Sequence, residues 1–126
     1  MQIRNRQIAE VTILDFCGRI VAGEDAALLR DSVRSLISRG EKNIVLNMEA
    51  VPYIDSAGIG ELVSALVAVG RQGGCLKLLN LTRRVYEVLE IVRLVTVFEI
   101  FDNEAKALST FPIAPAYPPA MRAQAS

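Results

Sequence analysis

NIVLNMEAVPYIDSAGIG, residues 43–60, passes from an apolar strand to the start of an amphipathic helix. The run Ile44–Met48 is short and apolar, which favours a strand buried in a parallel sheet. Asp55 and Ser56 are residue types that accept hydrogen bonds from the free N–H groups of a first helical turn, so a helix is predicted at Ser56–Gln72. A buried strand followed by a helix is a building unit of α/β folds.

The same alternation of strands and helices continues on both sides of this stretch. The predicted elements are strands Gln2–Ile8 and Val11–Cys17, helix Glu24–Arg39, strand Ile44–Met48, helix Ser56–Gln72, strand Cys75–Leu79, a helix capped by Thr82, strand Phe98–Phe101, and a short helix that is capped by Asp102 and ends near Phe111. The two-residue link Ala9-Glu10 makes the first two strands an antiparallel hairpin. We predict an α/β fold in a single domain at residues 1–111, with a mostly parallel sheet, an antiparallel N-terminal edge strand and about four helices.

The last segment, residues 112–126, has a different composition. It carries Pro112, Pro115, Pro118 and Pro119 among alanines. Such a segment buries little apolar surface and is predicted to be a mobile tail, although proline-rich segments also dock on partners.

Composition excludes several classes of function. The 126 residues include 14 basic and 14 acidic side chains, and this balance argues against a nucleic-acid-binding protein. There is no apolar run long enough to cross a membrane and no apolar core of a signal peptide near Met1, so a cytoplasmic protein is expected. Cys17 and Cys75 have neither zinc nor redox spacing and are predicted to be reduced core thiols.

Catalysis is disfavoured by the residue types present. The chain has no histidine, which excludes a Ser-His-Asp triad, a Cys-His pair and a histidine-ligated metal. It also has no Gly-rich loop with the lysine of a nucleotide-binding P-loop. We therefore expect no enzyme, no cofactor and no metal site.

The start of the helix Ser56–Gln72 is the candidate site. A serine there lies at the positive end of the helix dipole, where free N–H groups can stabilise an added phosphate. Gly58 and Gly60 leave the first turns without bulk, so a partner's backbone can approach closely. The plain alternative is that Asp55 and Ser56 only cap the helix.

Two faces are predicted for this helix. Its core-facing stripe consists of Ile59, Leu62, Val63, Leu66 and Val67. Its exposed face carries small residues at helical spacing, with an acidic residue beside them: Ala57, Gly60, Ser64 and Ala68, with Glu61. These small residues either allow close packing of another protein or simply favour the helix.

The run Val51–Gly60 and the strand Asn43–Asn47 before it resemble the signature of the STAS domain, in particular that of bacterial anti-sigma factor antagonists. That signature is an apolar stretch, Asp-Ser, a small residue, Gly, an aliphatic residue and Gly. The resemblance covers about residues 1–111 and implies a STAS-like fold. It implies that Ser56 is phosphorylated by an anti-sigma factor that is also a serine kinase, with Asp55 as its acidic neighbour.

The resemblance also implies a partner-switching pathway. The unphosphorylated protein would bind the anti-sigma factor and so free a sigma factor for transcription, and a PP2C-like phosphatase would reverse the phosphorylation of Ser56. The residues assigned to partner binding are Asp55, Ala57, Gly58, Gly60, Glu61 and Ser64. No direct contact with nucleic acid or membrane is expected, and the edge strand and the small-residue helix face both allow a weak homodimer.

The chain departs from the family at one position. Many members follow the second strand with Gly-x-Leu/Ile-Asp, and that acid is implicated in contacts with the kinase, whereas this chain reads Gly18-Arg19-Ile20-Val21. The departure keeps open a second class of function, an unphosphorylated STAS scaffold or a subunit of a transport or signalling complex. A third class, a small enzyme or nucleotide binder, is disfavoured by the missing residue types.

Arg83 and Arg84 open the third predicted helix, against the preference of the helix dipole. They are either a solvated pair or a contact for an acidic partner.

Overall fold

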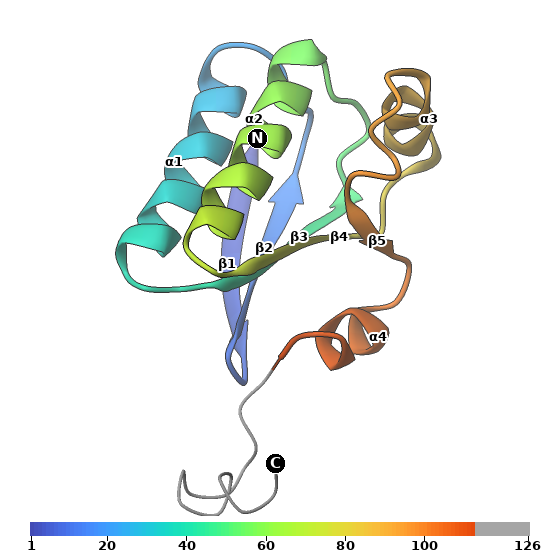
Figure 1. Cartoon of the computed structure of the whole chain (residues 1–126). Coiled ribbons are helices and arrows are strands. Elements are labelled where there is room, and N and C mark those ends of the chain that lie inside the picture. Colours follow the sequence, from blue (N-terminus) through green and yellow to red (C-terminus); the bar gives the residue numbers. More distant parts are fainter. Residues whose placement is uncertain (113–126) are drawn as a thin grey trace, which may run out of the picture.

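The computed structural model of the chain describes residues 1–112, so the predicted tail beyond Pro112 lies outside the described residues. Within them the order of elements is β1 (Gln2–Ile8), β2 (Val11–Cys17), α1 (Glu24–Ser38), β3 (Asn43–Ala50), α2 (Ser56–Arg71), β4 (Cys75–Leu79), α3 (Arg83–Ile91), β5 (Glu99–Phe101) and α4 (Glu104–Ser109). The predicted order β-β-α-β-α-β-α-β-α is confirmed (Figure 1).

The strands form one five-stranded sheet in the order β1-β2-β3-β4-β5. β1 and β2 are the predicted antiparallel hairpin, with Ile8 opposite Val11 and Ala9 turning the chain at a φ of 54°. The remaining neighbours, β2-β3, β3-β4 and β4-β5, are parallel. The mostly parallel sheet with an antiparallel N-terminal edge strand is therefore confirmed.

This strand order places three helices on one face of the sheet. Every parallel crossover steps to the next strand in the same direction, and crossovers of one hand then put their helices on one side. α1, α2 and α3 share a single core with the inward side chains of the sheet, including Leu14, Leu46 and Leu78. Figure 1 shows α1 and α2 side by side in front of the sheet, with α3 to the right.

The helix α4 packs on the opposite face. Ala107 and Phe111 form a smaller apolar cluster with the outward residues of the strands, which are Val11, Ile13, Val45 and Leu79. Lys77 is only 3% exposed on this face, where it pairs with Glu99 and lies over the rings of Phe101 and Phe111, 5.5 and 4.8 Å from their centroids. The buried ammonium group thus has both a carboxylate and aromatic rings around it.

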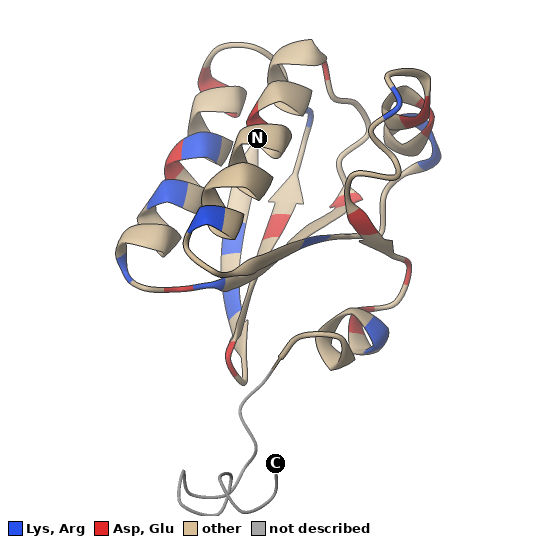
Figure 2. Ribbon diagram, in the orientation of Figure 1, with Lys and Arg blue, Asp and Glu red and all other residues tan. Residues whose placement is uncertain are grey.

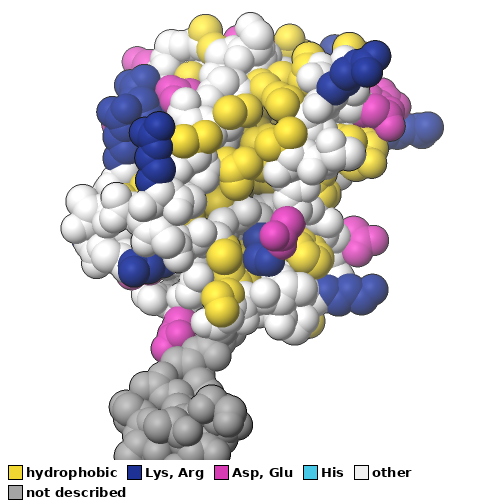
Figure 3. Space-filling view, in the orientation of Figure 1, with side chains coloured by type: hydrophobic (Ala, Val, Ile, Leu, Met, Phe, Trp, Pro, Cys, Tyr) yellow, Lys and Arg dark blue, Asp and Glu magenta, His cyan; other side chains and the backbone are white. Residues whose placement is uncertain are grey.

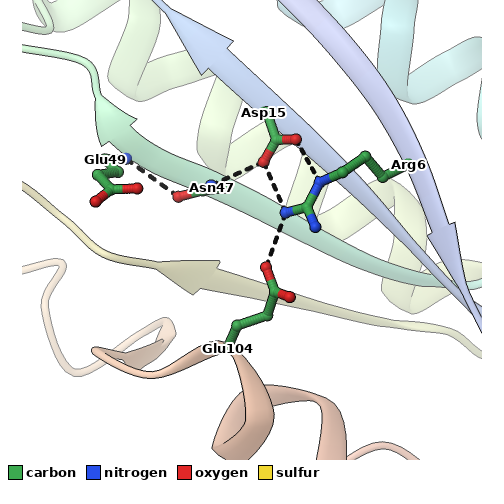
Figure 4. A network of polar contacts seen from close by, with 5 residues as sticks. All are labelled: Arg6, Asp15, Asn47, Glu49 and Glu104. Atoms are coloured by element: carbon green, nitrogen blue, oxygen red, sulfur yellow. Dashed lines mark hydrogen bonds and ion pairs between the residues drawn. The ribbon is translucent and has the colours of Figure 1, made fainter.

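On the sheet face that α4 covers, a polar network extends from α4 to β1 (Figure 4). Arg6 donates to both carboxylate oxygens of Asp15, at 2.5 and 3.0 Å, and to Glu104 on α4 at 2.8 Å, while Asn47 donates to Asp15 at 2.7 Å. Burial of Asp15 opposes its ionised form, but the hydrogen bonds from Arg6 and Asn47 outweigh it and hold the pKa of Asp15 below its ordinary value. The network ties α4 to the hairpin.

The buried face of α2 differs from the predicted stripe. The buried residues are Gly58, Ile59, Leu62, Ala65 and Val69, whereas Val63 and Leu66 are half-buried and Val67 is 45% exposed. Gly58 and Ala65 are small residues on the buried face, and Gly58 lets the helix backbone lie close to Ile20 in the connection between β2 and α1. Of the predicted stripe, Ile59 and Leu62 are buried and Val63 and Leu66 pack against the core at its margin, so only Val67 is misplaced.

Two smaller predictions are also wrong. Asn103, not Asp102, caps α4, because the helix begins one residue later and the Asn103 side chain accepts from the N–H of Lys106 at 3.0 Å. Cys17 is exposed and not a core thiol, because it ends β2 outside both apolar clusters. Cys75 is half-buried. Within residues 1–112, no helix has both the length and the apolar character needed to cross a membrane.

Candidate functional site

The site lies at the carboxyl ends of the parallel strands β2 and β3. Each strand is followed by a connection to a helix, and parallel strands bring both connections to the same edge. The connections are hydrogen-bonded to each other: the N–H of Ile20 donates to the carbonyl of Tyr53 at 3.0 Å, and the N–H of Asp55 donates to the carbonyl of Ile20 at 3.2 Å. The start of α2 is therefore held against the β2-α1 connection.

Asp55 joins these two connections through its side chain. One carboxylate oxygen accepts from the N–H of Gly58 at 2.9 Å and caps α2, as predicted from the sequence. The other oxygen accepts from the N–H of Ala22, in the β2-α1 connection, at 2.8 Å. The hydrogen bonds from Gly58 and Ala22 favour the charged carboxylate and lower the pKa of Asp55 below its ordinary value.

Ser56 is the first residue of α2, and its side chain is exposed. Within residues 1–112 its hydroxyl makes no hydrogen bond, because the capping role belongs to Asp55. The hydroxyl therefore lies in solvent at the positive end of the α2 dipole, beside an ionised carboxylate. This geometry permits a modifying enzyme to reach the oxygen.

The two glycines of the motif have different surroundings. A Cβ atom at Gly58 would lie 2.6 Å from the carbonyl oxygen of Ile20 and 2.6 Å from Cγ1 of Ile54. Gly58 is thus needed for the close approach of α2 to the β2-α1 connection, and the space at this residue is filled by the protein itself instead of lying open to a partner. Gly60 is exposed, and a Cβ there would meet nothing within 4 Å.

The other residues assigned to partner binding lie toward α1. Ser64 is exposed, whereas Ala57 and Glu61 are half-buried, as is Ala68 of the predicted small-residue face. Glu61 accepts a hydrogen bond from Arg30 of α1 at 3.2 Å. Ser64, Ala68 and Glu61 line a shallow cleft between α1 and α2, together with Arg30 and Arg34. The predicted small-residue face is therefore partly the wall of this cleft.

One contact beside the site was missed by the sequence prediction. The guanidinium of Arg84, in the first turn of α3, lies 5.2 Å from the centroid of the Tyr53 ring. Tyr53 precedes Asp55 and Ser56 on the connection between β3 and α2. No spacing in the sequence links these residues. Among the described residues no group of three or more metal-ligating side chains is close enough to hold a metal ion.

The architecture is that of a small α/β domain with one strand-to-helix site at its sheet edge. The sequence matches the STAS domain family over residues 2–107, so the chain belongs to the STAS domain family. The anti-sigma-B factor antagonist of Bacillus subtilis (strain 168) is 33% identical over 84 residues, which cover 64% of this chain and 76% of that protein.

Solved structures agree with this assignment. The crystal structure of the Thermotoga maritima protein TM1081 superposes with a TM-score of 0.81 at 24% identity, over 86% of this chain and 93% of that one. The phosphorylated form of the Bacillus cell fate determinant SpoIIAA superposes with a TM-score of 0.68 at 18% identity, over 86% of this chain and 97% of that one. At these identities the two structures establish the fold.

Proposed function

We propose that the protein is a partner-switching anti-sigma factor antagonist controlled by phosphorylation of Ser56. Unphosphorylated, it binds an anti-sigma factor in the cytoplasm and so releases a sigma factor for transcription. The observation that supports this most directly is the exposed hydroxyl of Ser56, which carries no capping role because Asp55 already caps α2. The B. subtilis relative is named for antagonism of an anti-sigma factor.

In this proposal, the negative charge of a phosphate on Ser56 controls binding of the partner. A phosphate on Ser56 adds about 1.5–2 negative charges at neutral pH. The fold tolerates this group, because the Ser56 side chain is exposed and lies at a helix N-terminus. The ionised Asp55 beside it, whose pKa is lowered, makes the phosphorylated surface strongly negative. A partner that packs on this surface then meets added bulk, repulsion and the cost of desolvating the phosphate.

The outer face of α2 is suited to such packing. Its charged residues are Glu61 and Arg71 alone, and Glu61 is neutralised by Arg30 (Figure 2). Hydrophobic side chains gather over α2 and between α2 and α3, with basic side chains on either side (Figure 3). They include Val67, which is 45% exposed. An uncharged, partly apolar surface next to Ser56 fits a reversible protein contact.

In this proposal the protein is a substrate of other enzymes and not a catalyst. The anti-sigma factor acts as the serine kinase, and a PP2C-like phosphatase restores the hydroxyl. Val21, which stands where many family members carry an acid, is half-buried, and its N–H donates to Asp25 at 3.4 Å. The kinase must therefore engage this edge without a carboxylate at residue 21.

The proposal is tested by incubating the protein with ATP and the purified anti-sigma factor that it captures from its source cell, followed by mass spectrometry. We expect one phosphate on Ser56 and none in Ser56→Ala, which should still bind. Ser109→Ala is the matched control, because Ser109 is an exposed serine on α4, on the opposite face of the sheet, and this variant should be phosphorylated like the wild type.

Phosphate on another residue of a folded Ser56→Ala protein would contradict the assignment. Capture of transporter subunits, with no kinase and no phosphate, would instead support the STAS scaffold as the function.

A further inference from the structure

The contact between Arg84 and Tyr53 has no role in the switch described above. The guanidinium lies 5.2 Å from the ring centroid, and a cation over an aromatic face is held in place while its N–H donors remain directed outward. Tyr53 is half-buried and Arg84 is exposed. The ring thus provides a fixed support for an accessible charge.

A hydrogen bond joins the start of α3, which carries Arg84, to the connection that carries Tyr53 and leads to Ser56. The hydroxyl of Thr82, which caps α3, donates to the carbonyl of Val51 at 2.9 Å and accepts from the N–H of Val85 at 3.4 Å. Val51 and Tyr53 belong to the connection that leads to Asp55 and Ser56. The start of α3 is therefore attached to the connection that leads into α2.

The charge of Arg84 is not balanced within the described residues. Arg83 pairs with Glu87 at 3.3 Å, but no carboxylate of residues 1–112 forms an ion pair with Arg84. Both arginines lie in the first turn of α3, where the helix dipole is also positive and disfavours them. The positive potential at this point favours an anionic group from outside the domain.

We propose that Arg84, supported by Tyr53, receives a carboxylate side chain of the anti-sigma factor; this inference rests on the proposed function. The planar guanidinium binds a carboxylate through two parallel N–H donors, a geometry that a lysine does not provide. Arginine is also among the residue types that most often dominate interface affinity. The partner's surface is therefore acidic where it meets the start of α3.

A partner acid at this place also adds to the effect of phosphorylation. Ser56 follows Tyr53 by three residues on the same connection, so the negative charge of its phosphate would oppose the approach of a carboxylate to Arg84. The modification then weakens binding through a defined charge on the partner as well as through bulk.

The test compares Arg84→Ala with the matched control Arg83→Ala, using the purified anti-sigma factor captured by the wild-type protein. We expect Arg84→Ala to weaken binding about tenfold or more and to reduce the dependence of affinity on salt. Arg83→Ala should stay within about twofold of the wild type, because its pair with Glu87 is exposed. Arg84→Lys should restore only part of the affinity, and the melting temperature of Arg84→Ala should not fall.

Three other outcomes would contradict the inference. Equal affinity of the Arg84→Ala and Arg83→Ala proteins would overturn the inference while leaving the proposed function intact. An effect of Arg84→Ala confined to the Ser56-phosphorylated form, such as faster removal of the phosphate, would overturn it by showing that the cation serves the phosphate. A wild-type protein that binds no anti-sigma factor would refute the proposed function, and this inference with it.

Discussion

At the scale of single residues, Asp55 and Ser56 have different roles, although the sequence alone allows either to cap the helix. Asp55 holds the structure by accepting from Gly58 and Ala22, and Ser56 is left exposed for chemistry. A phosphate on Ser56 therefore does not displace the helix cap. In the proposed switch, this division would let Ser56 change its charge while the fold around it persists.

The role of Asp55 predicts a dependence of stability on pH. Because its pKa is lowered in the folded state, the stability that it contributes is present above its unfolded pKa, about 3.9, and is lost as the pH falls through the folded value. We expect NMR titration of the Asp55 carboxyl carbon to give a pKa below the ordinary value. In Asp55→Ala, part of the acid sensitivity of unfolding between about pH 5 and 2 should disappear.

The carboxylate of Asp15 contributes to stability with the same sign, because its pKa is also lowered. Asp15→Asn is therefore a separate control, and an unshifted Asp55 titration would contradict the two hydrogen bonds assigned to that side chain.

The two glycines predict opposite effects of the same substitution. Gly58→Ala places a methyl group against the backbone of Ile20 and should destabilise the protein by about 1–3 kcal/mol or more in urea denaturation. Gly60→Ala meets open space in a helix interior and should stabilise it by up to about 1 kcal/mol. The added methyl at Gly60 should still weaken partner binding, because it lies on the exposed face. Equal stability of both variants would contradict the packing described for Gly58.

At the scale of elements, α4 is held on the second face of the sheet by few side chains. Phe111 packs with Ala107 over the cluster around Val45 and beneath the ammonium of Lys77, and Glu104 joins Arg6 of β1. The helix has 6 residues, and so short a helix depends on its tertiary contacts. Its position is set by those contacts and not by its own propensity.

Phe111→Ala should therefore act mainly on α4. We expect a loss of about 3 kcal/mol in the free energy of unfolding. Amide exchange should accelerate most strongly in α4, while Asp55 and Ser56 stay unchanged by NMR. If exchange accelerated equally in α1 and α2, the separation of the two faces would be contradicted.

The sequence predicted elements well where a local signal was sufficient. The order of the strands and helices followed from apolar runs, caps and glycines such as Gly40, which has a φ of 82° and follows the end of α1. It failed where packing decides: the buried side of α2 includes the small residues Gly58 and Ala65, and a hydrophobicity pattern weighs large residues more heavily. The pairing of Arg84 with Tyr53 depends on tertiary distance alone.

At the scale of the whole molecule, the candidate site and the polar network that supports α4 lie in different parts of the fold. The edge where β2 and β3 end carries the start of α2, and the neighbouring outer face of α2 is almost free of charge. The opposite face of the sheet carries the network of Arg6, Asp15 and Glu104. A charge added at Ser56 would therefore not take part in the ion pairs that join α4 to the hairpin.

The central claim is tested most directly by measuring the affinity of the purified anti-sigma factor for the unmodified protein and for the protein phosphorylated on Ser56. We expect the phosphate to weaken binding by about two orders of magnitude, which corresponds to about 3 kcal/mol, while the melting temperature changes by only a few degrees. Equal affinity of the two forms, or loss of binding only because the phosphorylated protein unfolds, would contradict the account.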